Sequence, residues 1–483
     1  MIQKAITKYG LALHLAMLAA LPSALAPFVS DHALGRTVLW LSFLGALWIF
    51  IEPSIRQGEH LSQARVRVLK GIVRDPVTWF FALLVFFTGV RWLNSGIELV
   101  YDSEKIAWSL SEPALTIFPA SSGDVGFLPF AVSVASMVVA VGLRQAVGLA
   151  ARVSFGLTGA FLAGLGGWAA AVAACAGWSP FVSDAATGFG VVREPLMGAL
   201  WGIWFIVSVS AGAQAELRSW KRGRLVLCVA SGGNAAGLVF FSPPLVSASY
   251  FAVALLFAIY TWFWVGRSGS KGAVARNLVF FLMGVAMAAF LLMSFAPEPV
   301  KKAKFEKIDP AVAWRGQEHE MDAALSGIAK RMWLQQPWVG VGLGAFRLKA
   351  PFVAQSEDWE VIPSNPVRAI NGYWTLLSER GNVMCALIAV GLGLMLWSWG
   401  ARGVEAFMHL RRNADADVFP FSCPPIVWVP LFFLPLLAVE GLFASVFSVG
   451  TLLLAVSAAL SLATASFPRR PSGDKQDKQK ENS

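Results

Sequence analysis

The chain has 483 residues, of which 56% are hydrophobic and 14% are charged, and its formal net charge is +10. Because a soluble globular domain carries about 25% charged residues, this composition excludes a soluble fold. The apolar residues gather in runs long enough for a helix to cross about 30 Å of hydrocarbon, where a helix satisfies its own backbone polar groups. We therefore predict an all-α integral membrane protein.

Twelve apolar runs predict about 12 transmembrane helices. Their approximate ranges are 10–30, 37–53, 77–94, 127–143, 154–178, 195–215, 225–241, 245–265, 277–296, 381–400, 425–440 and 442–465. The fifth run is dominated by small residues, which allow helices to pack closely, so we expect it at the centre of the bundle. The predicted domains are helices one to nine in residues 1–296, a large loop in 297–380, helices ten to twelve in 381–465 and a disordered tail in 466–483.

The beginning of the chain has two interpretations. Two lysines precede an apolar run that ends at the sequence SALA, Ser23–Ala26, a pattern that secretory signal peptides share. We favour an uncleaved first helix over a cleaved signal. The orientation of the later helices is the same in both cases.

The distribution of charge predicts the orientation of the bundle. With the N-terminus in the cytoplasm, most of the 39 lysines and arginines fall on the cytoplasmic side, as the positive-inside rule requires. Both termini are then cytoplasmic, and the loop of residues 297–380 is extracytoplasmic. This pattern explains the net charge without a nucleic-acid partner. The lysine-rich tail is expected in the cytoplasm, with anionic membrane lipids as a secondary partner.

The cysteines and histidines predict no metal site. Three of the four cysteines (Cys175, Cys228 and Cys385) fall in predicted helices, and Cys423 falls in a cytoplasmic segment. The spacing matches neither a disulfide framework nor a zinc motif, and no two histidines have the HxxxH spacing of a zinc helix. We expect neither a metal nor a cofactor.

The large loop has predicted structure of its own. Asp309-Pro310 predicts the start of a helix, with an N-cap acid and a proline at the first helical position, and Pro337 ends that helix after Gln336. An apolar stripe, expected against the membrane domain or at the membrane interface, consists of Met321, Leu325, Ile328 and Met332. A separate polar face, expected toward water or a ligand, consists of Arg315, His319, Asp322, Ser326 and Lys330. His319 alone on such a face is more often a surface residue than a catalyst.

A glycine-rich stretch, QQPWVGVGLGAF, follows this helix at Gln335–Phe346. Such a run cradles phosphate when it joins a strand to a helix, but no strand is predicted here, so we interpret it as a tight turn that brings the loop back against the helices. A second helix is expected after Ser364–Pro366, and it continues into the tenth span. Arg368, Asn371, Thr375 and Glu379 share one face of it. Glu379 on this face is either a general base for a hydroxyl or part of a capping and ion-pair pattern.

Arginines are frequent in the loop and at the predicted outer ends of the helices. A guanidinium group keeps its charge and grips phosphate with two hydrogen bonds. For any single arginine, a solvated loop balanced by acidic residues is the alternative interpretation. The arginines concerned are Arg36, Arg91, Arg193, Arg315, Arg331, Arg347, Arg368 and Arg380.

Two of these segments resemble a known family. RMWLQQPWVGVGLGAFR (Arg331–Arg347), followed by NGYWTLLSERG (Asn371–Gly381), is similar to the proline-hydrophobe-GxGxGxF segment and the later motif of the O-antigen ligase and O-antigen polymerase superfamily. The nine residues between Asn371 and Gly381 match the spacing of that family. The expected topology, about twelve helices with a late outer loop, is similar too.

The resemblance implies a C-type membrane glycosyltransferase fold in a bacterial inner membrane, with a periplasmic loop. It implies transfer of a glycan from an undecaprenyl diphosphate carrier to a saccharide or lipid acceptor, without a metal. The diphosphate would be bound by arginines, and the acceptor hydroxyl would meet a base. The residues assigned on this basis are Glu379 and His319 for catalysis, and Arg331, Arg347, Arg368, Asn371 and Arg380 for substrate binding.

This sequence departs from the family pattern at two places. Ile370 stands where the family has its motif histidine, and the segment Pro244–Val253 has no arginine where the family often has one. A catalytically degenerate family member is therefore an alternative interpretation. A secondary transporter with twelve helices is another, although transporters place charged residues inside the bilayer and the apolar runs here contain almost none.

Overall fold

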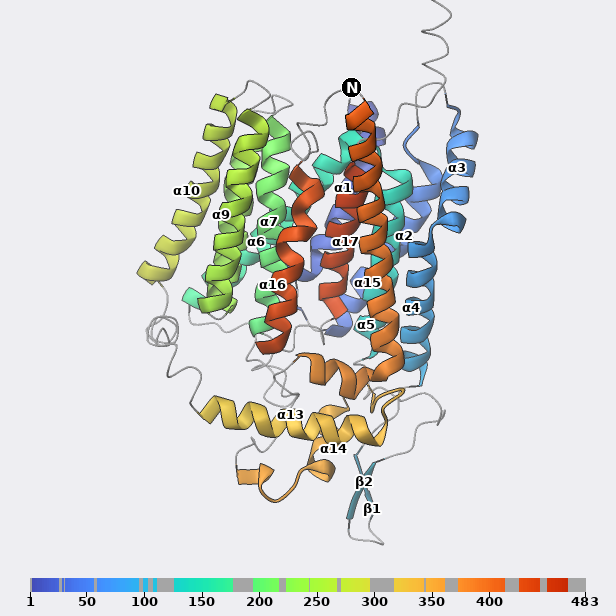
Figure 1. Ribbon diagram of the computed structural model, residues 1–483, viewed down its shortest axis with the longest axis vertical. Helices are drawn as coiled ribbons and strands as arrows, with labels where there is room; N and C mark the ends of the chain where they lie inside the picture. Colours follow the sequence, from blue (N-terminus) through green and yellow to red (C-terminus); the bar gives the residue numbers. More distant parts are fainter. Residues whose placement is uncertain are drawn as a thin grey trace, which may run out of the picture.

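A computed structural model describes most of the chain. The described ranges are 2–25, 28–29, 31–55, 59–94, 99–102, 107–110, 126–176, 194–216, 223–242, 244–266, 271–295, 317–342, 345–360, 372–412, 425–443 and 450–467. Within these ranges the fold is a bundle of long helices, with one two-stranded hairpin outside it (Figure 1). The all-α class predicted from composition is therefore confirmed for the bundle.

Each predicted apolar run overlaps one long helix. These helices are α1 (Ile2–Leu25), α2 (Asp31–Ile51), α4 (Pro76–Leu93), α5 (Phe127–Val141), α6 (Leu149–Cys175), α7 (Glu194–Glu216), α8 (Gly223–Phe241), α9 (Pro244–Gly266), α10 (Lys271–Phe295), α15 (Gly372–Arg412), α16 (Val429–Phe443) and α17 (Gly450–Ser466). A π-helical turn, η2 (Gly142–Ala146), extends α5, and a 3-10 turn, η6 (Pro425–Trp428), precedes α16.

The described helices have the length and apolarity of a membrane protein. Six segments are long and apolar enough to cross a bilayer: His32–Ile51, Pro76–Leu93, Phe127–Ala146, Ala151–Cys175, Leu278–Phe295 and Tyr373–Met408. Six further apolar helices are shorter over the described residues. Large apolar side chains such as Trp40, Phe86 and Phe290 are exposed on the outside of the bundle, which suits a surface in contact with lipid.

Helix α6 packs closely against its neighbours α1, α7 and α8, as its small residues predict. A β-carbon on Gly167 would collide with the backbone of Gly233 on α8, and one on Gly233 would collide with the backbone of Gly164. The two backbones therefore approach each other as closely as only glycine allows, which confirms the close helix packing expected for the fifth run.

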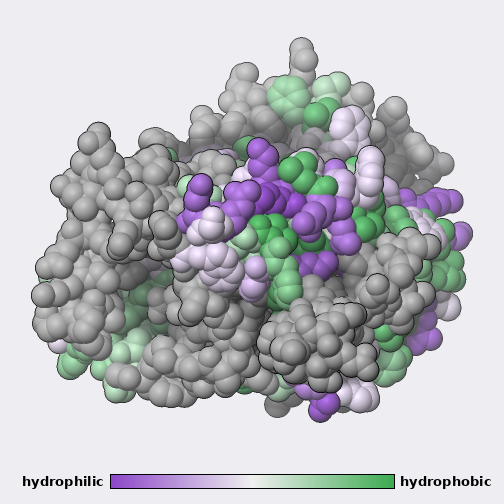
Figure 2. Space-filling view, turned by 90° about the horizontal axis from the view of Figure 1, so that it is seen from below, coloured by the Kyte–Doolittle hydropathy of each residue, from purple (hydrophilic) through white to green (hydrophobic). Residues whose placement is uncertain are grey.

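The large loop forms a layer at one end of the bundle, opposite the end that carries the N-terminus (Figure 1). Its elements are α13 (Gln317–Gln335), α14 (Phe346–Val353) and the 3-10 turn η4 (Asp358–Glu360). Seen from that end, the described surface carries a band of hydrophilic residues with hydrophobic residues beside it (Figure 2). The loop is thus a structured layer rather than a simple connection.

The apolar stripe of α13 corrects one expectation. Leu325, Ile328 and Met332 are fully or almost fully buried, and they form a separate small core with Val341, Ala345, Phe346 and Ala350. The stripe therefore packs mainly on the second half of the loop itself rather than on the membrane domain, because the turn after α13 folds α14 back onto it. The helix ends at Gln335, as Pro337 predicts, whereas its expected start at Asp309-Pro310 lies outside the described residues.

Two elements were not expected from the sequence. Helix α3 (Leu61–Arg74) precedes α4 at the end of the bundle that carries the N-terminus (Figure 1). Strands β1 (Leu99–Asp102) and β2 (Ala107–Leu110) form an antiparallel hairpin at the loop end, with Leu99 opposite Leu110. Both elements are short and contain polar residues, so a search for long apolar runs does not detect them.

Candidate functional site

The glycine-rich stretch forms a tight turn after α13. Gly340 and Gly342 have φ angles of 71° and 108°, values that glycine adopts without the steric cost of a β-carbon. The Gly340 N–H donates to Gln336 O at 2.9 Å, which closes the turn. The interpretation of this stretch as a tight turn is confirmed.

The turn meets a second special backbone position, Gly381, inside α15. Gly381 has φ 71° and ψ 174°, so the helix breaks there and resumes in a new direction. A β-carbon on Gly340 would collide with the backbone of Gly381, and a β-carbon on Gly381 would collide with the backbone of Gly340 and Val339. Both positions therefore require glycine for the same reason, which is that two backbones touch.

Backbone hydrogen bonds join the turn to both sides of this break. A helix break leaves N–H and C=O groups without their helical partners, and residues of the turn supply replacements. The four bonds are Val341 N to Ser378 O (2.8 Å), Gly342 N to Glu379 O (3.1 Å), Asn382 N to Pro337 O (2.8 Å) and Val383 N to Trp338 O (3.0 Å). The indole N–H of Trp333 on α13 also donates to Asn382 Oδ1 at 3.0 Å.

Arg91, in the last turn of α4, holds the same two segments from the membrane side. Its side chain is 0% exposed. Its Nη2 donates to the carbonyl oxygen of Val339 in the turn and to the carbonyl oxygen of Arg380, at 3.0 Å, next to the break. The guanidinium carbon lies 5.0 Å from the centre of the Phe87 ring. A buried arginine needs such partners because its desolvation is costly.

Charged side chains gather at this contact. Glu379 and Arg380 are both almost fully buried, and Arg91 lies within electrostatic range of both. We call this arrangement the glycine junction: the turn Gln336–Gly342, the break at Gly381, and the side chains of Arg91, Glu379 and Arg380. The described charged groups of the junction are thus two guanidinium groups and one carboxylate.

The junction contains two of the residues expected in the site, Glu379 and Arg380. Thr375, predicted on the same helix face as Glu379, is also buried. Arg331 lies on α13, where it forms an ion pair with Asp358 of η4, and the Asp358 carboxylate also accepts from Gln355 N at 2.7 Å. Arg331 therefore fastens η4 to α13 in this structure.

The other expected site residues fall partly or wholly outside the described residues. The backbones of His319 and Arg347 belong to α13 and α14, but their side chains are not among those described. Arg368 and Asn371 lie in the range 361–371, which is not described. Their assignments remain predictions.

Arg91 was identified from the sequence only as one of several arginines at outer helix ends. Its place in the junction depends on a contact with residues more than 240 positions away in the chain. The available signal was an arginine one turn before the end of an otherwise apolar helix, since an ionisable residue at membrane depth is costly and usually functional.

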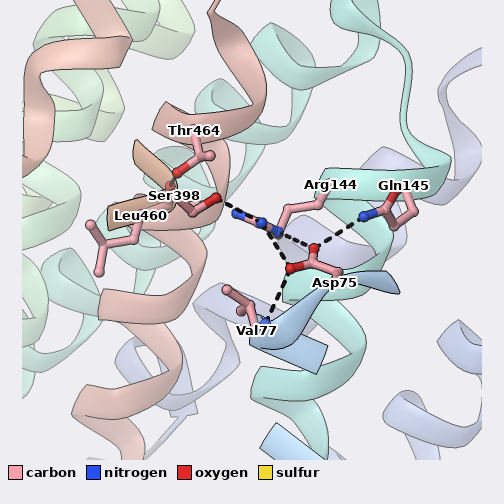
Figure 3. A network of polar contacts seen from close by, with 7 residues as sticks. All are labelled: Asp75, Val77, Arg144, Gln145, Ser398, Leu460 and Thr464. Atoms are coloured by element: carbon pink, nitrogen blue, oxygen red, sulfur yellow. Dashed lines mark hydrogen bonds and ion pairs between the residues drawn. The ribbon is translucent and has the colours of Figure 1, made fainter. Parts of the chain in front are cut away.

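A second, largely buried network (Figure 3) surrounds Asp75, which lies between α3 and α4. Helix α3 is at the end of the bundle opposite the loop layer (Figure 1). Arg144 in η2 donates to both oxygens of Asp75, at 2.7 and 3.0 Å, and to Ser398 Oγ on α15 at 2.9 Å. Asp75 also accepts from Gln145 Nε2 at 3.1 Å and caps α4 by accepting from Val77 N. This network joins α4, η2 and α15 through a paired charge.

The described residues offer no grouping that would hold a metal ion. Among the described residues, Cys175, Cys228 and Cys385 form no disulfide. Comparison of the sequence with protein-family models gives no match, and comparison with curated proteins gives none either. The functional assignment therefore depends on the residues of the chain and their arrangement.

Proposed function

We propose that this protein is a glycosyltransferase of the O-antigen ligase and polymerase type. It spans the inner membrane of a bacterium with twelve helices, and both termini are cytoplasmic. In the periplasm it moves a glycan from an undecaprenyl diphosphate carrier to a saccharide or lipid acceptor, in the synthesis of a cell-surface polysaccharide. The glycine junction lies at the periplasmic end.

One observation carries this proposal. The two segments on which the family resemblance rests, Arg331–Arg347 and Asn371–Gly381, meet at the glycine junction. They are joined there by backbone hydrogen bonds and by the buried Arg91. Segments that are recognised separately in the sequence, and that fold into one charged contact, are what a shared site requires.

The chemistry assigns a role to each group. The leaving diphosphate gains negative charge, and positioned guanidinium groups stabilise that charge without a metal. Arg380 serves this purpose at the junction, together with Arg331, Arg347 and Arg368 from the loop. Glu379 accepts the proton of the acceptor hydroxyl, with His319 as the second candidate. Asn371 orients the glycan, and Arg91 is a positioning residue because it holds backbone carbonyls.

The test compares paired substitutions on the same helix. Glu379→Gln and Arg380→Gln should each lower glycan transfer by about 100-fold or more. Glu405→Gln and Arg402→Gln are matched controls, because they remove an exposed ion pair of 3.2 Å near the other end of α15, and they should leave transfer unchanged. Equal activity of all four variants would exclude the catalytic role of Glu379 and Arg380.

The side of the membrane on which substrate accumulates separates transfer from transport. In a deletion strain, a transferase predicts lipid-linked glycan stranded on the periplasmic face, whereas a transporter predicts substrate trapped in the cytoplasm. A cysteine at the exposed position Gln335, in a chain without its native cysteines, should react with a membrane-impermeant maleimide in intact spheroplasts. A cysteine at Glu405 should not react until the membrane is opened, and the reverse result would refute the orientation.

A further inference from the structure

Helix α3 presents three different faces around its axis. Ala64 and Val68 are buried against the bundle. A second face is apolar but exposed, with Val66, Leu69 and Val73 at 51%, 52% and 57% exposure. Exposed apolar residues at helical spacing, next to basic residues, are typical of a helix that lies in a membrane surface.

The third face of α3 is basic and lines a groove of about 610 Å³. Arg67 is fixed there by Glu59 at 2.8 Å and by the carbonyl oxygens of Ser54 and Gln145. Lys70 and Arg74 also line the groove and are exposed. Neither has an acidic partner within ion-pair distance among the described residues, so their charges face the open groove.

The apolar face of α3 continues into the lipid-facing surface of the bundle. The indole N–H of Trp79, an exposed residue at the start of α4, donates to Val73 O at 2.9 Å. Further along α4, Leu83 and Phe86 are exposed on the outside of the bundle. Tryptophan is enriched where hydrocarbon meets the headgroups. The surface of the bilayer at this end therefore lies at the level of α3, with the basic groove among the headgroups.

We propose that the groove beside α3 binds the phosphate group of an anionic phospholipid. Lys70 and Arg74 contact the phosphate, and the acyl chains lie on Val66, Leu69 and Val73. A soluble phosphate or a polyanion would use the basic face alone, whereas only a lipid uses the apolar face beside it. The site lies at the end of the bundle opposite the glycine junction and does not depend on the proposed transferase activity.

The test measures lipid retained by the purified full-length protein. Native mass spectrometry of protein taken from micelles with equal phosphatidylglycerol and phosphatidylcholine should show preferential retention of phosphatidylglycerol. Lys70→Gln combined with Arg74→Gln should weaken that retention about 30-fold, since each basic residue at an anionic surface contributes about 1 kcal/mol. Lys330→Gln combined with Arg402→Gln removes the same charge elsewhere and should retain the lipid as the unmodified protein does.

Three further results distinguish a lipid from a soluble phosphate and a loss of charge from misfolding. Leu69→Asn with Val73→Asn should also lose phosphatidylglycerol, and excess inorganic phosphate should not displace the lipid. The exchanged pair Lys70→Arg with Arg74→Lys should restore retention, which separates loss of charge from misfolding. Equal retention by the two glutamine double variants, full retention by the asparagine variant, or displacement by phosphate would each overturn the proposal.

Discussion

An arginine ties helices together at each end of the bundle, fully buried at Arg91 and largely buried at Arg144, but the two arginines use different partners. Arg144 donates to the carboxylate of Asp75 and to a hydroxyl. Arg91 donates to the carbonyl oxygens of Val339 and Arg380, and it lies within electrostatic range of Glu379 and of a second guanidinium. Arg144 thus forms an ion pair at the start of a helix. Arg91 instead is a cation that binds backbone carbonyl oxygens.

This difference in partners distinguishes a structural ion pair from the candidate functional site. In the Arg144 network the two charged groups pair with each other, so we assign this network a structural role alone. At the glycine junction the guanidinium groups and the carboxylate lie where a loop outside the bundle meets a broken helix, and the proposed function assigns chemistry to Glu379 and Arg380 there. Substitutions at the two ends should therefore respond differently, and the predictions below start with the largest effect.

The strongest test of the junction is Gly381→Ala. The new β-carbon would collide with the backbone at Val339 and Gly340, and alanine disfavours the positive φ of 71°, so we expect a loss of about 3 kcal/mol or more of unfolding free energy. Thermal unfolding in detergent and limited proteolysis of the loop measure it. Gly393→Ala on the same helix is the control, because a β-carbon there meets nothing within 4 Å. Similar unfolding curves for both variants would contradict the backbone contact.

Arg91→Met should lower the free energy of unfolding by about 2 to 4 kcal/mol, because the carbonyl oxygens of Val339 and Arg380 lose a buried donor. It should also abolish glycan transfer, since the turn is released from the break. We expect no second substitution to restore the loss fully, because the two acceptors of Arg91 Nη2 are backbone carbonyl oxygens. A second-site change of one side chain that fully restores the stability of Arg91→Met would contradict this description.

Arg144→Met should lower the free energy of unfolding by about 3 kcal/mol, because it leaves the buried Asp75 carboxylate without its cation. Here a rescue is expected. Asp75→Asn keeps the cap on α4 and removes the charge, so the double variant should recover to within about 1 kcal/mol of the original protein. A double-mutant cycle by thermal unfolding measures the coupling, and additive losses would show that the pair is not coupled.

The smallest effect is expected at Lys349 in α14. Burial lowers the pKa of Lys349, so the folded state binds this proton more weakly than the unfolded chain does, and stability should rise as the pH rises through the folded pKa toward the ordinary lysine value. Lys349→Met should therefore raise the unfolding midpoint modestly at neutral pH, and the gain should shrink in alkali. Lys330→Met, an exposed lysine of α13, is the control. A gain that is independent of pH would contradict a charge effect.

Much of the fold follows from local patterns. The apolar runs predicted the positions of the long helices, the small residues of α6 predicted its close packing, and Pro337 predicted the end of α13. The same reasoning missed α3 and the hairpin, because both are short and partly polar. It also placed the stripe of Leu325, Ile328 and Met332 against the membrane domain or at the membrane interface, since periodicity shows that a face is buried but not against what.

The candidate site was only partly accessible to the same reasoning. Glu379 and Arg380 were selected from a motif, and they do lie together at the junction. Arg331 was selected for diphosphate, yet in the structure it pairs with Asp358, a partner 27 positions away that no local pattern indicates. From the sequence, Arg91 was one of several arginines at outer helix ends. Only the fold shows that it contacts the turn.

The sequence by itself determined that this chain is a helical membrane protein, where its long helices lie and that the glycine-rich stretch forms a tight turn. These properties depend on the length of an apolar run and on the composition of a short segment, and both are local. Only the tertiary structure decided that Gly340 faces Gly381 and that Arg91 bonds to both segments. Contacts between residues far apart in the chain depend on how whole helices pack, and no neighbouring residues encode that packing.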